Sequence, residues 1–203
     1  MGVRATDESR TPAMIEYALR DSSLGTALIA VSEKGVCVIA LGDAPEPLIA
    51  DLHKRFPKAL ITEAGARSQG LIARALAAVE AGESPASEHT DSLPLHLCGT
   101  PFQQAVWAAL REIGPGAIAN YAGLAQRLGA PKAIRAVAGA CAANPVAVVI
   151  PCHRVLRSDG SLCGYRWGVD RKRRLLQREG ARCGLPLRRV ENKPSPKFDE
   201  RAV

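Results

Sequence analysis

The segment Pro151-Cys152-His153-Arg154 holds the residues of this chain that are best suited to covalent chemistry. A thiolate is a strong nucleophile, and a nearby imidazole promotes its formation by accepting the thiol proton. Adjacent side chains of an extended chain point in opposite directions, so the ring of His153 must turn back towards the sulfur or act through a water molecule. The segment therefore predicts a nucleophile at Cys152.

Glu179 could complete this pair. It lies in the last turn of an expected helix that ends at Gly180, where the helix dipole disfavours a carboxylate. A role in orienting His153 would explain this position. Cysteine, histidine and glutamate in this order fit a cysteine hydrolase triad and fit a transferase equally well, so the residue types alone leave both reactions open.

Short secondary-structure elements must position Cys152, His153 and Glu179. Residues 146–150 are a continuous apolar run that leads into the reactive segment, and such a run predicts a buried strand. The helix that ends in the glutamate is expected to begin at Asp170, whose side chain can cap it, and to bury Leu175 and Leu176.

The segment before the cysteine predicts helices around a tight turn. Thr100-Pro101-Phe102-Gln103 has the residues of a helix start with a capping box. Helices over 121–128 and 131–143, joined by Gly129-Ala130, form a helix-turn-helix candidate. The second helix is mostly alanine and glycine. It either packs tightly on a neighbouring helix or enters a narrow groove, into which Arg135 would reach as the long polar side chain.

The first half of the chain has an α/β pattern. Two apolar runs within residues 26–41 predict a hairpin, and residues 45–56 and 69–81 have helical periodicity. Residues 82–88 have the composition of a linker. The expected divisions are a loose N-terminus over 1–12, an α/β domain over 13–92, a second domain over 93–180 and a disordered tail over 181–203.

Charge is unevenly distributed along the 203 residues, whose net charge is +7. Residues 1–98 hold 9 basic and 13 acidic side chains, a net charge of 9 − 13 = −4. Residues 131–182 hold 11 basic and 3 acidic side chains, a net charge of 11 − 3 = +8. This asymmetry favours a polyanion partner for the second half, with a merely basic surface as the alternative.

The cysteine pattern argues against a disulfide framework and against a zinc module, because the six cysteines are far apart and form no Cys-x-x-Cys pair. They are Cys37, Cys98, Cys141, Cys152, Cys163 and Cys183. All but Cys152 are expected to be reduced structural thiols. We expect Cys37, Cys98, Cys163 and Cys183 to be dispensable for the reaction, and this expectation does not extend to Cys141. No apolar stretch reaches the ~18 residues of a membrane span, and the first residues are not a signal peptide, so a cytoplasmic protein is expected.

A family resemblance covers residues 16 to 180. The motif Pro151-Cys152-His153-Arg154-Val155, preceded by Arg135-Ala136-Val137 and Asn144-Pro145, resembles the signature of the O6-alkylguanine-DNA alkyltransferases. Gly164-Tyr165-Arg166-Trp167-Gly168 and the segment from Leu175 to Gly180 extend the match. The chain is most similar to the C-terminal half of the bacterial Ada members, including Asn120-Tyr121 and the Thr100 helix start.

The resemblance implies a set of catalytic residues. Cys152 would accept the alkyl group, while His153 and Glu179 would draw its proton away through a water molecule. Asn144 would hold the recognition helix against the active-site turn. Tyr121 would crowd the phosphate of the flipped nucleotide and offer a proton to guanine.

The resemblance also implies DNA and substrate contacts. Arg135 would fill the gap left by the flipped nucleotide, and the other DNA contacts would come from Ala136, Ala138, Gly139, Ala140 and Tyr121. The substrate pocket would be lined by Val155, Tyr165, Arg166, Trp167 and Cys141. Phosphates would meet a basic surface around Arg154, Arg157 and Arg166.

The fold implied by the resemblance is an α/β, ribonuclease H-like N-terminal domain followed by a mainly helical, winged-helix-like DNA-binding domain. The implied activity is the irreversible transfer of a methyl or larger alkyl group from O6-alkylguanine, and from O4-alkylthymine, in double-stranded DNA to Cys152. The protein would be consumed in the reaction, would act as a monomer and would need no metal or organic cofactor.

Two further expectations concern neighbouring classes of protein. Ada carries a zinc-cysteine module and a transcription-activating region, for which we expect no counterpart here, so a stand-alone repair protein is favoured. Non-catalytic DNA-binding members of the family lack the acceptor cysteine, whereas Cys152 is present.

Overall fold

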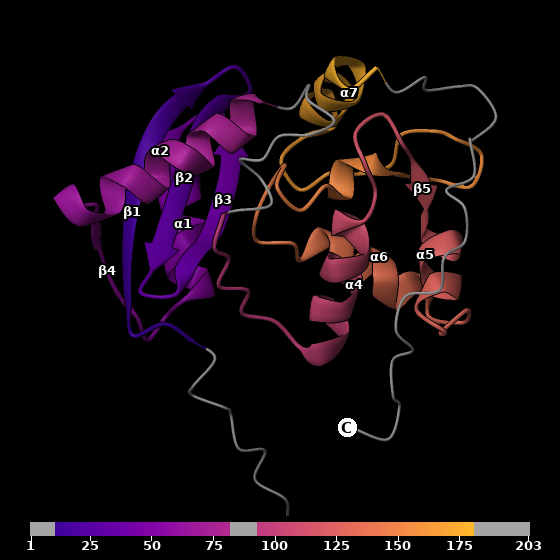
Figure 1. Ribbon diagram of the computed structural model, residues 1–203, viewed down its shortest axis with the longest axis horizontal. Coiled ribbons are helices and arrows are strands. Elements are labelled where there is room, and N and C mark those ends of the chain that lie inside the picture. The colour runs from indigo at the N-terminus through magenta and orange to yellow at the C-terminus, as the bar shows by residue number, and fades with distance from the viewer. Residues whose placement is uncertain (1–10, 82–92, 181–203) are drawn as a thin grey trace, which may run out of the picture.

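The computed structural model describes residues 11–81 and 93–180, which form a sheet-rich N-terminal region and a helical C-terminal region (Figure 1). The expectations for the first ten residues, the 82–92 segment and the 181–203 tail with Cys183 lie outside the described residues. No helix within the two described ranges is long and apolar enough to cross a membrane.

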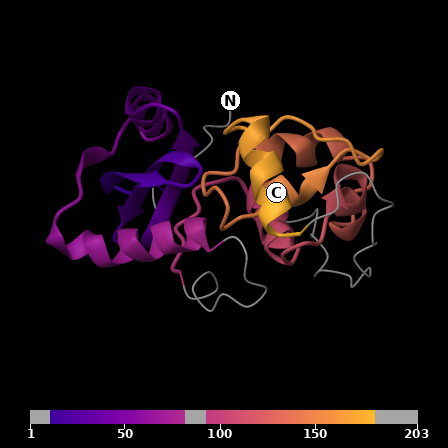
Figure 2. The same cartoon turned by 90° about the horizontal axis from the view of Figure 1, so that it is seen from above.

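The N-terminal region is a four-stranded sheet in the order β3-β2-β1-β4. Its strands are β1 (Met14–Ser22), β2 (Gly25–Ser32), β3 (Gly35–Gly42) and β4 (Leu60–Glu63), with β1 antiparallel to β2, β2 antiparallel to β3, and β1 parallel to β4. Helices α1 (Pro45–Arg55) and α2 (Ala66–Glu80) lie on opposite faces of this sheet (Figure 2). Both faces of β3 are therefore buried.

The sequence prediction of the hairpin β2–β3 is confirmed, as are the two helices, although α2 begins three residues earlier than predicted. Strands β1 and β4 were not predicted. Both lack a long apolar run, because β4 is a short, mostly exposed edge strand and only Ile15 and Ala18 of β1 are buried.

The C-terminal region contains three helices that pack on one another, α4 (Pro101–Arg111), α5 (Tyr121–Arg127) and α6 (Ile134–Ala142). The rest of it consists of the short strands β5 (Ala119–Asn120) and β6 (Val155–Leu156), which pair in parallel, the 3-10 turn η2 (Cys152–Arg154) and helix α7 (Val169–Arg178). The capping box predicted at Thr100 and Gln103 is present at the start of α4.

Three local predictions were wrong. Residues 146–150 form a turn instead of a strand: only Val146 bridges to a strand residue, Ile39, and Val148 has a φ of +68°. These residues are apolar because they are buried between the two regions, not because they belong to a sheet. Helix α6 begins at Ile134, since residues 131–132 form a turn. Helix α7 is capped by Gly168, with Asp170 inside its first turn.

The two regions share one apolar core and are joined by polar contacts. Backbone hydrogen bonds run from the Ile39 N–H to the Pro145 carbonyl, at 3.0 Å, and from the Ala147 N–H to the Ile39 carbonyl, at 2.8 Å. Arg171 donates to the Leu24 carbonyl at 2.6 Å and pairs with Asp43. The two backbone bonds of Ile39 attach the turn before Cys152 directly to β3, and the contacts of Arg171 attach α7 to the N-terminal region.

Candidate active site

Asn144 fixes the position of the Cys152 thiol. Its Nδ2 donates to the Cys152 sulfur at 3.2 Å and to the Ile150 carbonyl at 2.8 Å, while its Oδ1 accepts from the Val146 N–H at 3.0 Å. Asn144 is fully buried, so all three bonds are shielded from water. The end of α6, the turn and the reactive sulfur are thereby held as one unit.

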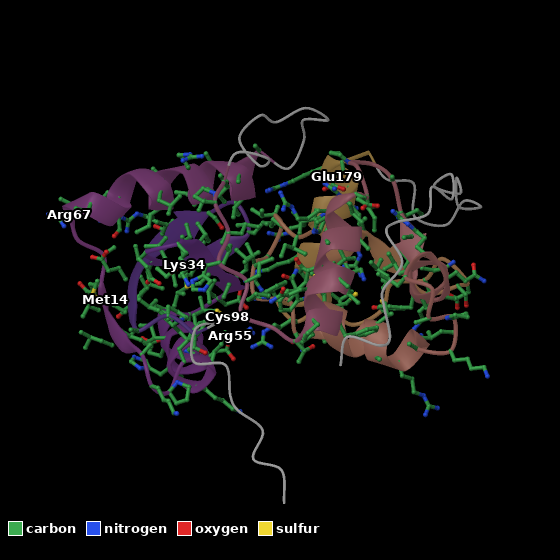
Figure 3. The ribbon with its side chains drawn as sticks, turned by 60° about the horizontal axis from the view of Figure 1, so that its bottom comes forward. Met14, Lys34, Arg55, Arg67, Cys98 and Glu179 are labelled. Carbon is green, nitrogen blue, oxygen red and sulfur yellow. The ribbon has the colours of Figure 1, made fainter. Side chains whose placement is uncertain are left out.

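His153 and Glu179 form a buried pair, with 2.9 Å between Nε2 and the carboxylate, and neither side chain is exposed. Figure 3 shows Glu179 at the end of α7. Since a carboxylate only accepts, the Nε2–H of His153 must donate, and Nδ1 is then an acceptor. That nitrogen is buried and has no hydrogen-bond partner in the structure, so it is free to receive a proton.

Arg154 completes the environment of Glu179. Its Nε and Nη2 donate to the carboxylate at 2.9 and 2.7 Å, and its Nη1 donates to the Ile113 carbonyl. The placement of Glu179 in the last turn of α7 is thus explained by two donors that face it. The guanidinium of Arg154 is engaged inside the protein, so the expectation that it offers a free charge to phosphates is wrong.

The protonation states follow from burial and these bonds. Burial raises the pKa of the Cys152 thiol to about 11, against the effect of the Asn144 hydrogen bond. Burial lowers the pKa of His153, against the effect of Glu179. Burial alone would raise the pKa of Glu179, but the hydrogen bonds from His153 and Arg154 lower it to about 2. At neutral pH the site therefore holds a thiol, a neutral imidazole and a carboxylate.

A second set of polar groups lies around Tyr121. The phenol oxygen is 3.0 Å from the sulfur of Cys163, and Lys172 donates to that sulfur at 3.3 Å and to the Val155 carbonyl at 2.6 Å. Lys172 is fully buried. Sequence reasoning assigned no role to Lys172 and expected Cys163 to be dispensable. Spacing could have revealed the lysine, because it lies three and four residues before the buried Leu175 and Leu176, on the same face of α7.

Of the residues expected to line the substrate pocket, Tyr165 and Trp167 are in contact, whereas Arg166 forms an ion pair outside this set. The ring of Tyr165 makes edge contacts with Trp167, at 5.1 Å between centroids, and with His153, at 6.5 Å, and its buried hydroxyl has no partner in the structure. Val155 and Cys141 are buried. Arg166, expected in the same pocket, instead pairs with Asp51 of α1 at 2.6 Å, and its side chain is 33% exposed, so its contact with phosphates stays a prediction.

Helix α6 has one exposed and one packed face. Arg135, Ala136 and Gly139 are exposed and Ala138 is half-buried. Ala140 is only 3% exposed, and its carbonyl accepts from the Trp107 indole at 2.9 Å, so the structure corrects the expectation of an exposed contact there. The helix thus combines close packing with an outer surface that begins with the exposed Ile134 and Arg135 and continues with small side chains.

Arg55 of α1 reaches the end of α6. Its guanidinium donates to the Ala143 carbonyl at 3.4 Å, and Figure 3 shows Arg55 at the junction of the two regions. Because Ala143 is followed by Asn144, the N-terminal region supports the buried amide from two sides, through Arg55 and through the backbone bonds of Ile39.

Comparisons with known proteins identify the family. Residues 101–181 match the family described as 6-O-methylguanine DNA methyltransferase, DNA binding domain. The chain is 36% identical over 152 residues to the inducible methylated-DNA–protein-cysteine methyltransferase of Bacillus subtilis (strain 168), which covers 74% of this chain and 82% of that protein. The chain belongs to the methylated-DNA–protein-cysteine methyltransferase family.

Other members of this family are also similar. The bifunctional transcriptional activator/DNA repair enzyme Ada of Escherichia coli (strain K12) is 48% identical over 165 residues, which are 81% of this chain and 45% of that protein. The chain spans about half the length of several curated relatives that it matches. The structure of Mycobacterium tuberculosis OGT in complex with DNA is similar with a TM-score of 0.63 and 33% identity, over 82% of this chain and 92% of that one.

In this methyltransferase family member, the lowered pKa of Glu179 predicts acid sensitivity. A carboxyl whose pKa falls from 4.5 to about 2 on folding stabilises the protein above pH 4.5, and this contribution is lost as the pH falls towards 2. The variant Glu179→Gln should lower the free energy of unfolding by about 1 to 3 kcal/mol near neutral pH, because buried donors lose a charged acceptor.

The difference between wild type and Glu179→Gln should shrink as the pH is lowered through this window, as measured by urea unfolding at several pH values. The matched control is Glu63→Gln, which removes an exposed carboxylate from β4. A difference that stays constant with pH would contradict the assigned charge state of Glu179.

Proposed function

We propose that this chain repairs DNA by transferring the alkyl group of O6-alkylguanine to the sulfur of Cys152. The observation that carries the proposal is the arrangement of the thiol, which is fixed by Asn144 and lies next in sequence to a neutral His153 with a free, buried Nδ1. The names of the related methyltransferases support the same activity.

The reaction would be an in-line displacement at the alkyl carbon. The Cys152 proton passes to Nδ1 of His153 through a water molecule, and the carboxylate of Glu179 stabilises the imidazolium that forms. Tyr121 supplies a proton to the departing guanine. The product is a thioether, and the site contains no group that cleaves one, so each protein molecule reacts once. No metal or organic cofactor takes part.

The DNA partner would be a duplex from which the damaged base is flipped, at a cost of a few kcal/mol. The exposed Ala136 and Gly139 and the half-buried Ala138 let α6 approach a minor groove closely, and Arg135 fills the vacated space. Tyr165, Trp167 and Val155 would form the walls around the flipped base. The complex of the M. tuberculosis relative with DNA supports this partner.

Further parts of the proposal concern the substrate range, the type of fold, and the oligomeric state and location of the protein. O4-alkylthymine would be a second substrate, because its alkyl oxygen lies on the same type of ring edge. The mixed sheet with helices on both faces would be ribonuclease H-like, and the α4–α6 unit with the β5–β6 pair would be winged-helix-like. The protein would act as a cytoplasmic monomer.

The intact mass of the protein after reaction distinguishes an alkyltransferase from a cysteine hydrolase. After the protein is mixed with a duplex that contains O6-methylguanine, its mass should increase by one methyl group, mapped to Cys152, and one lesion should be repaired per protein molecule. Many lesions repaired per molecule would contradict a stoichiometric mechanism, and catalytic turnover of esters or amides would favour the cysteine hydrolase.

The His153–Glu179 pair should control the rate of transfer and not DNA affinity. In Glu179→Gln the imidazolium loses its counter-charge, so single-turnover methyl transfer should slow by roughly one to three orders of magnitude. Binding to undamaged duplex, measured by fluorescence anisotropy, should stay near the wild-type value. An unchanged transfer rate in the folded variant would assign Glu179 a structural role only.

Arg135 should separate base flipping from chemistry. Truncation to alanine leaves the packed face of α6 intact, since Arg135 is exposed. Repair of a duplex lesion should fall by about tenfold or more because the unstacked base loses its substitute partner, whereas duplex affinity and its salt dependence should change only modestly. Ala136→Ser, a small change on the same exposed face, is the control.

The measurement for Arg135→Ala is a pair of rate constants, one for the duplex lesion and one for free O6-alkylguanine. The free base needs no flipping, so its slow reaction with Cys152 should be nearly unaffected. If both rate constants drop by the same factor, Arg135 supports the fold or the cysteine and the proposed role in flipping is wrong.

A further inference from the structure

A buried lysine without a carboxylate partner among the described residues lies against Cys163, which contacts Tyr121. Lys172 is fully buried, yet within residues 11–81 and 93–180 it forms no ion pair with a carboxylate. Its hydrogen bonds go to a carbonyl, that of Val155, and to the thiol of Cys163. Burying an ammonium group without a counter-ion costs several kcal/mol, and an apolar side chain of similar size would fill the same space without this penalty.

The contacts of Lys172 lead to the Tyr121 phenol. The lysine donates to the Cys163 sulfur at 3.3 Å, and this sulfur is 3.0 Å from the phenol oxygen. The Cys163 thiol has two acceptors within reach, the Tyr121 oxygen at 3.0 Å and the Val155 carbonyl at 3.6 Å, and when it donates to the closer one the three groups form a continuous hydrogen-bonded line.

We propose that Lys172 and Cys163 form a proton relay that resupplies the Tyr121 phenol while guanine departs. This inference rests on the proposed function, because it concerns the leaving group of that same reaction. Lys172 and Cys163 are positioning residues that act through Tyr121, and Tyr121 is the only member of the line that would touch the substrate.

The proton balance of the step is complete. The sulfur of Cys152 forms a bond to the alkyl carbon while the bond from that carbon to O6 breaks, and the electron pair of the broken bond stays with guanine. Tyr121 gives its proton to the guanine anion, the Cys163 thiol gives its proton to Tyr121, and the Lys172 ammonium gives one to Cys163. The Cys152 proton has passed to His153, so the net result is an imidazolium and a neutral amine, which exchange with solvent afterwards.

The environment of the phenol explains why a relay is needed. Burial raises the pKa of Tyr121 far above its ordinary value, and the contact with Cys163 raises it further. A phenolate left behind in this site would therefore be strongly disfavoured. Replacing the proton as it leaves removes that penalty and allows a buried tyrosine to act as an acid.

Single-turnover methyl transfer from two matched duplexes tests the relay. One contains O6-methylguanine and the other O6-methyl-8-azaguanine, whose extra ring nitrogen makes the departing base more acidic and less dependent on protonation. The variants are Cys163→Ala, which interrupts the line, and Cys163→Ser, which keeps a donor and acceptor there. The control is Cys37→Ala, which removes a buried thiol from β3, far from Tyr121 in the fold.

Cys163→Ala should slow transfer from O6-methylguanine by about tenfold to a hundredfold and transfer from the 8-aza duplex by much less, because the loss of acid catalysis affects the poorer leaving group more. Cys163→Ser and Cys37→Ala should stay within about threefold of wild type on both duplexes. Equal slowing on both duplexes, or wild-type rates for Cys163→Ala, would overturn the relay. A wild-type protein that takes up no methyl group from either duplex would overturn the proposed function itself.

Lys172→Met tests the source of the proton independently. Methionine fills a similar volume without charge, so urea unfolding should show a fold at least as stable as that of wild type. The leaving-group discrimination should match that of Cys163→Ala. If Lys172→Met is folded and keeps the wild-type ratio of rates on the two duplexes, the lysine is not part of a relay.

Discussion

The amide of Asn144 is the interaction on which the rest of the site depends. One side chain accepts from the Val146 N–H and donates to both the Ile150 carbonyl and the Cys152 sulfur. These bonds hold a turn that contains Val148 at a φ of +68°, a conformation that β-branched residues rarely adopt. The buried amide thus fixes a backbone path that the local sequence would not choose, and this path joins the exposed helix α6 to the reactive thiol.

Burial affects two groups of polar side chains in the site, one around Cys152 and one around Tyr121. Around Cys152 it keeps sulfur protonated and imidazole neutral, so the thiol is protected until a substrate is present. Around Tyr121 it raises the pKa of the phenol, which on its own is therefore a very weak acid. The same exclusion of water that makes the nucleophile inert at rest therefore strengthens every hydrogen bond that would act during transfer.

None of Cys152, His153 and Glu179 comes from the N-terminal region, but this region supports the helices and the turn that position them. Ile39 of β3 bonds to both sides of Val146 through the backbone, Arg55 of α1 bonds to the end of α6, and Arg171 of α7 bonds to Leu24. A continuous apolar core lies beneath these contacts. The sheet is accordingly a rigid support for the turn, for α6 and for α7, and it holds these three elements in fixed relative positions.

The sequence by itself determined the reactive segment, the Thr100 capping box, the hairpin and the family, because each depends on local spacing or on a contiguous motif. The prediction of a strand at residues 146–150 was wrong, because an apolar run indicates that residues are buried but not which secondary structure they form. Only the tertiary structure decided that Arg154 and Arg166 are engaged by Glu179 and Asp51. It alone also placed Lys172 against Cys163 and Cys163 against Tyr121, because contacts between residues 9 and 42 positions apart arise from packing, which no local pattern encodes.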